Sequence, residues 1–568
     1  MKPLDWPHLP FWRWTLLAGA LLWTSGCSET PADANPAPDA DVALEDVFEP
    51  IDAAGEDVES APDAEERPEP GPGSWRLPEG YYVPAKMEMT LVHPRPEAAE
   101  WAYSKNAHPG VRWEIPIVVQ GGAWPFQYAI VDDGGAEGLQ IGGELMREDV
   151  EGFIVHRVSP EYGVLWWDDP QEGDYDITLR VSDQDGSTLD VEVSLRVGVD
   201  GWIFVDGSSG SPEGDGSLEA PFASVDQIHA LGEAAAGHRV YVGGVVAMDG
   251  NRENGNLRIA EDTPTPAVWV GWPEREGVLE AYEGKIVLDR PDFYIANLEH
   301  RHHEDYFPME DSYLHMITVW YDTDRYTVHD VDFTRFQGVG SNVNLGNSSI
   351  MMLTKNDHGR KHVAVVNNTL SGPNGILTSS YQLRHAVFEK NRAVDAVFTV
   401  ADGSVWSIIY IKSGNNEFVT LRANAFVENN EWPNRKSALG LLRARNIELA
   451  YNLIDTPYDS GRTGALTLWT NSALSDYGWT TETPVWIYRN SLRQRISYEG
   501  DPVVNLPDGT VITEHNILDQ GSWPTSSKIV DIENLDEAAY LDESMRLTGE
   551  HRDARLGRWG AEIAVPVD

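Results

Sequence analysis

The sequence predicts an all-β protein in which a right-handed parallel β-helix follows a β-sandwich. The first observation is a repeated pattern: apolar residues stand five and three places before an asparagine, as Val419 and Leu421 do before Asn424, and another such as Phe426 often follows it. The second observation is the spacing of these repeats, roughly 23 to 38 residues, which is typical of solenoids. A β-sandwich with asparagines in its turns is the alternative, but it predicts spacings of about 8 to 12 residues.

Each asparagine is expected to close a strand. Alternation with period two indicates a strand, and asparagine tolerates the left-handed conformation of a tight bend. Stacked coils would bring identical asparagines together, so that their side chains bond in a ladder. Asn297 and Asp332 are weaker upstream candidates. The predicted ladder consists of Asn368, Asn391, Asn424, Asn452, Asn490 and Asn516.

Other apolar stretches are predicted to form the second strand of successive coils. They are residues 267–271, 285–288, 315–321, 350–355, 407–412, 438–442 and 465–469. Residues 358–362 are expected to form a turn, and the Gly-Ala phrase at 557–561 fits the closing end of the repeats.

Composition limits the classes of protein and partner. The 568 residues allow two or three domains, and 41% hydrophobic residues with 21 tryptophans suffice for sizeable cores. The formal net charge of −49 argues against nucleic acid and against non-specific binding to anionic surfaces. The single cysteine, Cys27, excludes an intramolecular disulfide.

The N-terminus predicts export. Residues 14–23 form an apolar run that follows basic residues and is too short to span a bilayer, so residues 1–26 are expected to be a signal peptide. The phrase Thr24-Ser25-Gly26-Cys27 resembles the bacterial lipobox, although Thr24 replaces the usual leucine. The resemblance implies that Cys27 is lipidated and that only this anchor contacts a membrane, in a bacterial envelope or outer-membrane lipoprotein. A secreted protein with an incidental cysteine is the alternative.

Two segments are expected between the signal peptide and the repeats. Residues 27–75 are rich in Ala, Pro, Asp and Glu, which predicts an extended acidic tether. Residues 76–199 have short strands separated by turns, and the phrase at 173–181 resembles the final hairpin of bacterial immunoglobulin-like and cadherin-like modules. Asp183 and Asp185, in the turn of this hairpin, are either calcium ligands or turn formers. No other cofactor is expected.

Residues 200–246 differ from both neighbours. A loop rich in Gly and Ser leads through the phrase Pro-Phe-Ala-Ser-Val to a helix expected at 225–236, with Ser224 and Gln227 as a capping box, and then to a strand at 239–246. The order resembles the N-terminal cap of the pectate-lyase-like β-helix superfamily. The resemblance implies that 200–246 covers the open end of a β-helix formed by 247–564.

Alignment of the coils on their asparagines predicts a binding row. Neighbouring coils lie about 4.8 Å apart, so residues at one offset should form a line along the surface. Cations in such a line would make a locally positive groove for an anionic sugar chain, and a tryptophan could stack on a sugar ring. The residues at this offset are Trp320, Lys355, Ser379 and Lys412.

A second resemblance concerns catalysis. The phrase Ile-Lys-Ser-Gly-Asn-Asn at 411–416 resembles the segment of the chondroitinase B and alginate lyase family that carries its catalytic lysine. The resemblance implies that Lys412 is the base that acts next to a uronate carboxyl group and that Arg443 or Arg435 completes proton transfer. The Arg-His-Gly phrase and the acidic calcium ligands of the family are absent.

Two functions are therefore expected. The first is a monomeric surface or adhesion protein that binds polysaccharide without catalysis, with Trp320, Lys355 and Arg435 as binding residues. The second is a polysaccharide lyase that uses Lys412 and Arg443. A glycoside hydrolase is not expected, because no paired acidic residues recur at matching offsets. Residues 300–304 include three histidines, but an exposed loop is favoured there over a metal site.

Overall fold

The fold is described from a computed structural model of the chain. The described residues are 76–150, 153–248, 257–260, 263, 265–282, 286–303, 315–319, 323–334, 348–352, 360–373, 376–381, 383–397, 409–412, 416–427, 437–442, 444–455, 464–469, 484–493, 496–499, 508–518, 529–535, 560–561 and 563–566. Residues 1–69 form a separate unit, and the expected signal peptide, tether and Cys27 lie outside the described residues.

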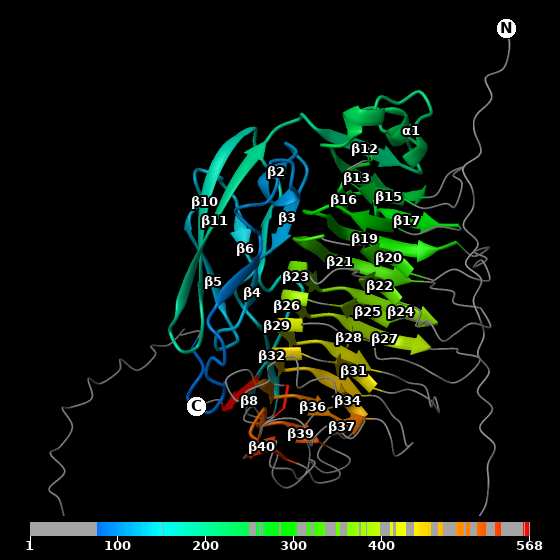
Figure 1. Cartoon of the computed structure of the whole chain (residues 1–568). Helices are drawn as coiled ribbons and strands as arrows, with labels where there is room; N and C mark the ends of the chain where they lie inside the picture. Colours follow the sequence, from blue (N-terminus) through cyan, green and yellow to red (C-terminus); the bar gives the residue numbers. More distant parts are fainter. Residues whose placement is uncertain are drawn as a thin grey trace, which may run out of the picture. The chain divides into compact units, whose positions relative to one another are not determined.

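The described part of the chain is all-β and is dominated by two parallel sheets (Figure 1). The first sheet has 20 strands: β12 (Trp202–Asp206), β13 (Arg239–Gly243), β14 (Val245–Ala247), β16 (Val268–Gly271), β17 (Val278–Ala281), β19 (Tyr294–His302), β21 (Tyr326–Thr334), β23 (Arg360–Val366), β24 (Thr369–Pro373), β26 (Leu383–Glu389), β27 (Arg392–Val397), β29 (Asn416–Arg422), β30 (Ala425–Val427), β32 (Ala444–Ala450), β33 (Leu453–Asp455), β35 (Val485–Tyr488), β36 (Ser491–Leu492), β38 (Val511–Glu514), β39 (Ile517–Leu518) and β40 (Ile529–Ile532).

The second parallel sheet has nine strands. They are β15 (Leu257–Ala260), β18 (Ile286–Asp289), β20 (His315–Val319), β22 (Ser348–Met352), β25 (Ile376–Tyr381), β28 (Ile409–Lys412), β31 (Ser437–Leu442), β34 (Gly464–Trp469) and β37 (Ile496–Glu499). Six of the seven expected second strands occur here, whereas residues 267–271 contain β16 of the larger sheet.

The chain alternates between these two sheets. After β25 it forms β26 and β27 of the larger sheet, and after β28 it forms β29 and β30. We call each such passage a coil and the strands from β12 to β40 the parallel stack. Neighbouring coils pair in register, as Ala386 does with Val419 and Phe388 with Leu421. Successive coils lie one below another in Figure 1.

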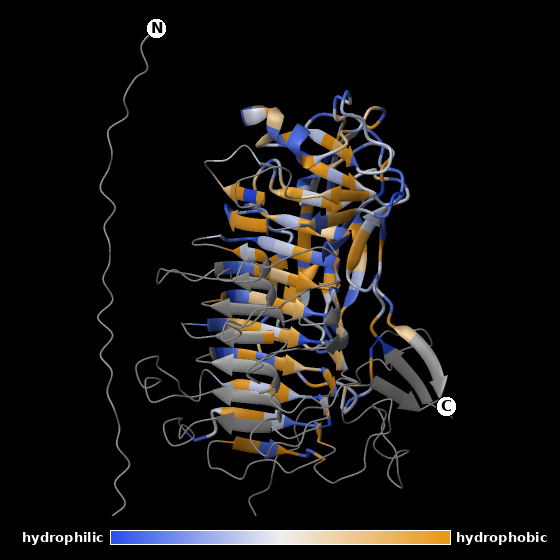
Figure 2. Cartoon of the chain, turned by 90° about the vertical axis from the view of Figure 1, so that its right-hand side faces the viewer, coloured by the Kyte–Doolittle hydropathy of each residue, from blue (hydrophilic) through white to orange (hydrophobic). Residues whose placement is uncertain are grey.

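Alternating apolar residues build the interior of the parallel stack. Val419, Leu421 and Phe426, the residues of the repeated pattern, are fully buried and belong to one hydrophobic cluster that extends from Ile203 to Leu518. Apolar positions accordingly recur on the strands of successive coils in Figure 2. Each such side chain contributes about 1.5 to 3 kcal/mol when fully buried, so the cluster stabilises the stack along its length.

A ladder of buried asparagines joins the coils. Asn424 Nδ2 donates a hydrogen bond to Asn452 Oδ1 at 2.9 Å, and its backbone N–H donates to the same oxygen at 3.1 Å. Asn424 Nδ2 also donates to the carbonyl of Phe388 at 3.0 Å, so both side-chain groups have partners, as buried polar groups require. The side-chain bonds link Asn368, Asn391, Asn424, Asn452, Asn490, Asn516 and Asn534 in this order.

The bend differs from the expected one. The left-handed conformation belongs to the residue before each ladder asparagine, with φ of 53° at Ala423 and 55° at Tyr451. The asparagine bonds instead to the next coil. The upstream candidates do not join the ladder: Asn297 has the left-handed conformation itself, and Asp332 pairs with Thr369, one residue past the ladder position.

Residues 76–199, which we call the N-terminal region, form smaller sheets. One has four strands in the order β2 (Asn106–Ala107), β11 (Thr188–Val197), β10 (Gly173–Ser182) and β5 (Gln127–Asp132). Another has β3 (Trp113–Pro116), β9 (Val164–Trp167) and β6 (Gln140–Ile141), and β1 (Thr90–His93) pairs with β4 (Val118–Gln120). The expected hairpin is confirmed, because β10 and β11 pair antiparallel over their whole length.

A fourth small sheet joins distant parts of the sequence. β8 (Phe153–Arg157) pairs antiparallel with β7 (Met146–Val150) on one side and with β41 (Ile563–Pro566) on the other. The expected end of the β-helix at residue 564 therefore falls inside a strand that pairs with the N-terminal region. β41 pairs with the edge of β8 that β7 does not occupy.

The N-terminal region packs against the 20-stranded sheet. Val92 of β1 and Val118 of β4 form one buried cluster with Ala364, Val366 and Val387 of the stack. The second hydrophobic core contains side chains of the N-terminal region together with Tyr241, Tyr294, Tyr451 and Tyr488 of the stack. Part of the outer face of the larger sheet is therefore covered.

The helix of the expected cap is shorter than predicted. α1 spans Val225–Ala230 and is followed by a 3-10 turn at Gly232–Ala235. Ser224 makes no side-chain capping bond, and Gln227 Oε1 accepts a hydrogen bond from Ala223 N–H at 2.8 Å, so the predicted capping box is wrong. No helix among the described residues is long and apolar enough to cross a bilayer.

Candidate functional site

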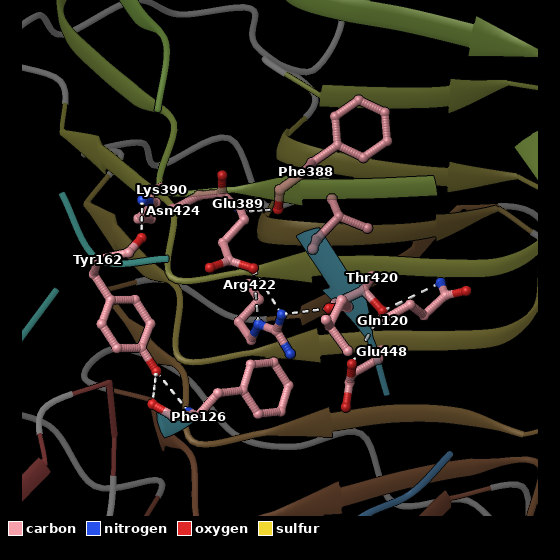
Figure 3. Close-up of polar contacts among 12 residues, drawn as sticks. Gln120, Phe126, Tyr162, Phe388, Glu389, Lys390, Thr420, Arg422, Asn424 and Glu448 are labelled. Carbon is pink, nitrogen blue, oxygen red and sulfur yellow. Dashed lines mark hydrogen bonds and ion pairs between the residues drawn. The ribbon is translucent and has the colours of Figure 1, made fainter. Parts of the chain in front are cut away.

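The covered face of the larger sheet contains buried charges (Figure 3). Arg422 is fully buried, its Nη2 lies 2.7 Å from Glu389 Oε2 and donates to the carbonyl of Val119 at 2.8 Å, and its guanidinium lies 4.8 Å from the ring centre of Phe126. Burial lowers the pKa of Arg422, but attraction to Glu389 and Glu448 outweighs it, so the net pKa is raised. Arg422 is therefore charged.

Neighbouring polar groups complete this network. Thr420 donates to Glu448 Oε2 at 3.0 Å, and the Tyr488 hydroxyl donates to the other oxygen of the same carboxylate. Gln120 of the N-terminal region donates to the carbonyl of Phe418 at 2.6 Å. The bond from Gln120 to Phe418, like that from Arg422 to Val119, fastens the N-terminal region to the stack.

Lys390 extends the same network. Its Nζ donates to the carbonyls of Tyr162 at 2.6 Å and Pro160 at 3.1 Å, and burial lowers the pKa of Lys390 to about 8. Burial also raises the pKa of Asp330 to about 6. Shifted pKa values are common at functional sites, but structural ion pairs shift them too. Because Lys390 and Arg422 are bonded to the backbone of the N-terminal region, we interpret them as docking residues.

The structure describes only part of the row expected from the sequence. Trp320, Lys355, Arg435 and Arg443 lie outside the described residues. Ser379 and Lys412 are placed by the strand register, but they are not in line: Lys412 pairs with Tyr381, and Ser379 pairs with Tyr410. The expectation that Ser379 and Lys412 share one position is wrong by two residues, because counting back from the asparagines ignores differences in turn length.

The position of Lys412 does define a row of the nine-stranded sheet. Ile411, Leu441 and Leu468 pair in register on successive coils, and the residue after each continues the line. Trp469 in turn pairs with Glu499. This row, which we call the Lys412 row, contains Tyr381, Lys412, Leu442, Trp469 and Glu499.

A second row of charged residues lies where the chain turns from the nine-stranded sheet into the larger one. Lys361 pairs with Arg384, Arg384 with Glu417, and Glu417 with Arg445, on four successive coils. Lys361 is exposed and the other three are half-buried. Arg445 Nη2 lies 2.9 Å from Glu417 Oε2. This charged row has three cations and one anion, although the whole chain has a formal charge of −49.

Stacked rings stand beside the charged row. The rings of His362 and His385 lie 5.5 Å apart at 11°, and those of His385 and Phe418 lie 5.0 Å apart at 4°. The three residues have φ of 59°, 53° and 55°, so the same left-handed bend recurs on each coil. Repetition of this bend stacks the rings.

The histidines add no positive charge at neutral pH. Burial, followed by repulsion from Arg95 and His385, lowers the pKa of His362 to about 4. Burial likewise lowers the pKa of His385. The positive character of the site therefore comes from Lys361, Arg384 and Arg445, and Arg384 Nε is buried with no hydrogen-bond partner among the described atoms.

The N-terminal region borders this site. Glu97 Oε1 lies 4.0 Å from His362 Nε2, and Gln120 Oε1 lies 3.2 Å from His385 Nδ1. Arg95 donates to the carbonyl of Leu91 at 2.6 Å. The charged row therefore runs along the seam between the N-terminal region and the stack.

Candidate metal ligands do not converge in the described part of the chain. Asp183 accepts hydrogen bonds from Ala123 N–H at 3.1 Å and Ser187 N–H at 2.7 Å, and Asp185 accepts one from Ala85 N–H at 2.8 Å. Both carboxylates thus hold backbone turns. Among the described residues, no three metal-ligating side chains gather.

Two of the three histidines of residues 300–304 lie in a strand and not in the exposed loop that was favoured, and His303 directly follows the strand. His300 and His302 are buried in β19, because alternate residues of the strand face the core. Arg301 instead donates to Glu280 at 2.8 Å. Residues 360–362 likewise begin strand β23, so the turn expected there is wrong.

Comparisons with protein-family models, with curated proteins and with solved structures return no match for this chain. The site therefore rests on its own residues. Sequence reasoning missed the charged row, although a signal was present: Lys361, Arg384, Glu417 and Arg445 each stand seven residues before a ladder asparagine. The shorter offset crosses fewer turns than the one used above, so it holds the register.

Proposed function

We propose that the protein is a non-catalytic binding protein for anionic polysaccharide. In this proposal the parallel stack is a right-handed parallel β-helix, and the N-terminal region is an immunoglobulin-like sandwich docked on it. The observation that carries the proposal is the charged row: Lys361, Arg384 and Arg445 gather three cations on one line of a strongly acidic chain.

The spacing of the charged row favours an extended ligand over a compact one. Coils lie about 4.8 Å apart, so the row from Lys361 to Arg445 extends over about 14 Å. A uronate or sulfated sugar chain carries an anionic group at regular intervals along its length. Arginine can bind a carboxylate or sulfate with two parallel hydrogen bonds, which adds direction to the attraction.

The test compares purified protein with a charge-reversed variant. We expect immobilised alginate, pectate or chondroitin sulfate to bind the chain and neutral dextran not to bind. Lys361→Glu combined with Arg384→Glu should weaken binding by roughly 10- to 100-fold, since local charge then opposes the ligand. The matched control reverses two exposed cations outside the row, Arg76→Glu with Arg258→Glu. An equal loss of affinity in both variants, or equal binding of dextran, would exclude the charged row as the binding site for anionic polysaccharide.

A second candidate function is β-elimination on a uronate polymer. The specific observation is that Tyr381 and Lys412 pair in register on adjacent coils. Lys412 as base would take the proton next to the uronate carboxyl group, the electrons would form a carbon–carbon double bond, and the bond to the leaving sugar oxygen would break. Tyr381 would supply the proton to that oxygen. Lys412 would need a lowered pKa to act near neutral pH.

Elimination is distinguished from binding by its product. The unsaturated end absorbs ultraviolet light, so incubation with alginate, pectate or chondroitin should raise the absorbance. A rise that Lys412→Ala abolishes and Lys361→Glu leaves intact would establish the lyase. Constant absorbance with bound polysaccharide would support the non-catalytic function.

We further propose that Cys27 anchors the protein in a bacterial envelope. The proposal is supported by the lipobox-like phrase before this only cysteine. Labelling with a fatty acid should mark the wild type and not Cys27→Ala, which should leave the membrane fraction. A Cys27→Ala protein that remains in the membrane fraction would exclude the anchor.

A further inference from the structure

One edge of the four-stranded sheet lacks a partner strand over most of its length. β11 pairs with β10 along its whole length, but on its other side it pairs with β2 only at Arg196 and Val197. Among the described residues, no strand pairs with this side from Thr188 to Leu195. An open edge presents free backbone donors and acceptors to any extended chain.

The hydrogen bonds identify which backbone groups face this edge. Gly198 N–H donates to the carbonyl of Ala107 at 3.1 Å, and Asp183 N–H donates to the carbonyl of Ser187 at 3.0 Å in the hairpin turn. Because successive amides alternate in direction, the odd residues of β11 bond to β10 and the even ones face away. The amides and carbonyls of Asp190, Glu192 and Ser194 therefore point to the open edge.

A groove of about 510 Å³ lies beside the part of β11 from Glu192 to Arg196. Pro94, Pro96 and Lys105 line one side, and Glu192 to Arg196 of β11 line the other. Val193 and Leu195 also belong to its lining, but their side chains are buried in the core, so Glu192, Ser194 and Arg196 present the side chains of β11 to the groove. A second groove of about 540 Å³ shares Asn106 and Arg196 with it and continues toward Gly237.

We propose that this groove binds an extended peptide that adds to β11 as a further strand. The backbone of the peptide would pair with Asp190, Glu192 and Ser194, in line with β2. Its alternate side chains would lie in the groove beside Glu192 and Ser194. This recognition by strand addition combines backbone hydrogen bonds with pockets for every second side chain. The open edge of eight residues accommodates about 27 Å of extended chain.

The charge of the surrounding sheet selects a cationic peptide. Asp174, Asp176, Glu192 and Arg196 line the groove on the side of the sheet, and Arg95, Glu100 and Lys105 line the other side. Arg95 lies 2.9 Å from Glu97 and Lys105 lies 3.6 Å from Glu100, so these two cations are paired, and the sheet side has three anions and one cation. Asp190 is already paired with Arg180 by two hydrogen bonds of 2.7 and 2.9 Å. A second copy of this chain would bring its own acidic edge against this one, which like-charge repulsion disfavours. Lysine or arginine alternating with apolar residues fits instead.

The test uses a fluorescent peptide of four Lys-Val repeats and the purified protein. Fluorescence anisotropy should report saturable binding, and a peptide of four Glu-Val repeats should bind at least 10-fold more weakly. A Lys-Val peptide N-methylated at every second residue cannot pair on that side, so it should also lose at least 10-fold. Hydrogen exchange followed by mass spectrometry should slow in residues 188–196 when the Lys-Val peptide is present.

Protein variants separate this groove from general attraction to an acidic protein. Asp176→Lys with Glu192→Lys should weaken binding at least 10-fold, and Asp226→Lys, on the exposed surface of α1, should leave it unchanged. Equal binding of the methylated peptide, or unchanged exchange in β11, would overturn the proposal. A concentration-dependent dimer that protects residues 188–196 would assign the edge to a second copy and would overturn it as well.

Discussion

Two arginines on adjacent coils occupy opposite environments. Arg422 of β29 is covered by the N-terminal region, bonded to Glu389 and Val119 and fully buried. Arg384 of β26 lies in the charged row and is half-buried, and its Nε has no hydrogen-bond partner among the residues that the structure describes. The same residue type thus fastens two parts of the protein in one place and is available to a ligand in the other. Whether the N-terminal region covers the arginine therefore determines the role of that arginine.

The largest effect should come from removing the covered arginine. Arg422→Ala leaves the carboxylates of Glu389 and Glu448 buried without their cation, which typically costs about 3 to 5 kcal/mol. The free energy of unfolding, measured with a chemical denaturant, should fall by that amount. A loss below about 1 kcal/mol would mean that the interface is wet and that the two arginines differ less than the structure implies.

Acid should weaken the covered interface next. Burial, only partly offset by the hydrogen bond to the Pro116 carbonyl and by Asp292, lowers the pKa of His93 from 6.5 to about 4. Between pH 6.5 and 4, His93 therefore binds a proton in the unfolded chain but not in the folded protein. The stability that is present above pH 6.5 is lost as pH falls toward 4. The loss from His93 is at most about 3 kcal/mol.

A variant without the imidazole isolates this contribution. His93→Gln should flatten the dependence of unfolding free energy on pH between 6.5 and 4, although His302 and His362, with pKa values lowered by burial to about 3 and 4, still contribute. An unchanged slope in His93→Gln would assign the acid effect to the other histidines.

Salt should weaken the interactions of the cations in the charged row more than those of the buried cations under the N-terminal region. Raising ionic strength from about 0.05 to 0.5 M screens exposed charges much more than buried ones. We expect affinity for an anionic polysaccharide to fall at least 10-fold, whereas the unfolding free energy should change little. Salt-independent affinity would indicate contacts other than Lys361 and Arg384.

The smallest effect on stability should come from Arg445, the half-buried residue at one end of the charged row. Arg445→Ala removes the ion pair with Glu417, in which the arginine side chain is 33% exposed. Such pairs contribute less than about 1 kcal/mol, so unfolding should be nearly unchanged while polysaccharide affinity falls. Destabilisation equal to that of Arg422→Ala would erase the contrast between the two regions.

The all-β class and the repeating pattern were predictable from local sequence. Val419, Leu421 and Asn424 carry a signal that the fold repeats at each coil. Asn534 escaped because Asp531 stands where the pattern requires an apolar residue, yet its side chain still accepts the bond from Asn516. The pairing of β8 with β41 was not predictable, because the local sequence of a strand does not indicate which distant strand it pairs with.

The candidate site was predictable only in part. A row of cations was expected, but its members were chosen across turns of variable length, and Ser379 consequently fell out of line with Lys412. The buried pair of Arg422 and Glu389 was missed because only the covering by Val119 and Phe126 makes those charges interior. Such covering is a tertiary property that single-chain periodicity does not contain.

The pairing of β41 with β8 also constrains the order of folding. The hairpin of β7 and β8 keeps an unpaired edge until residues 563–566 are available, so this sheet cannot be completed until the strands of the stack have been made. Contacts between residues so far apart in sequence slow folding, because a long loop must close before they form. Until then the edge of β8 presents free backbone donors and acceptors, and it can pair with another chain.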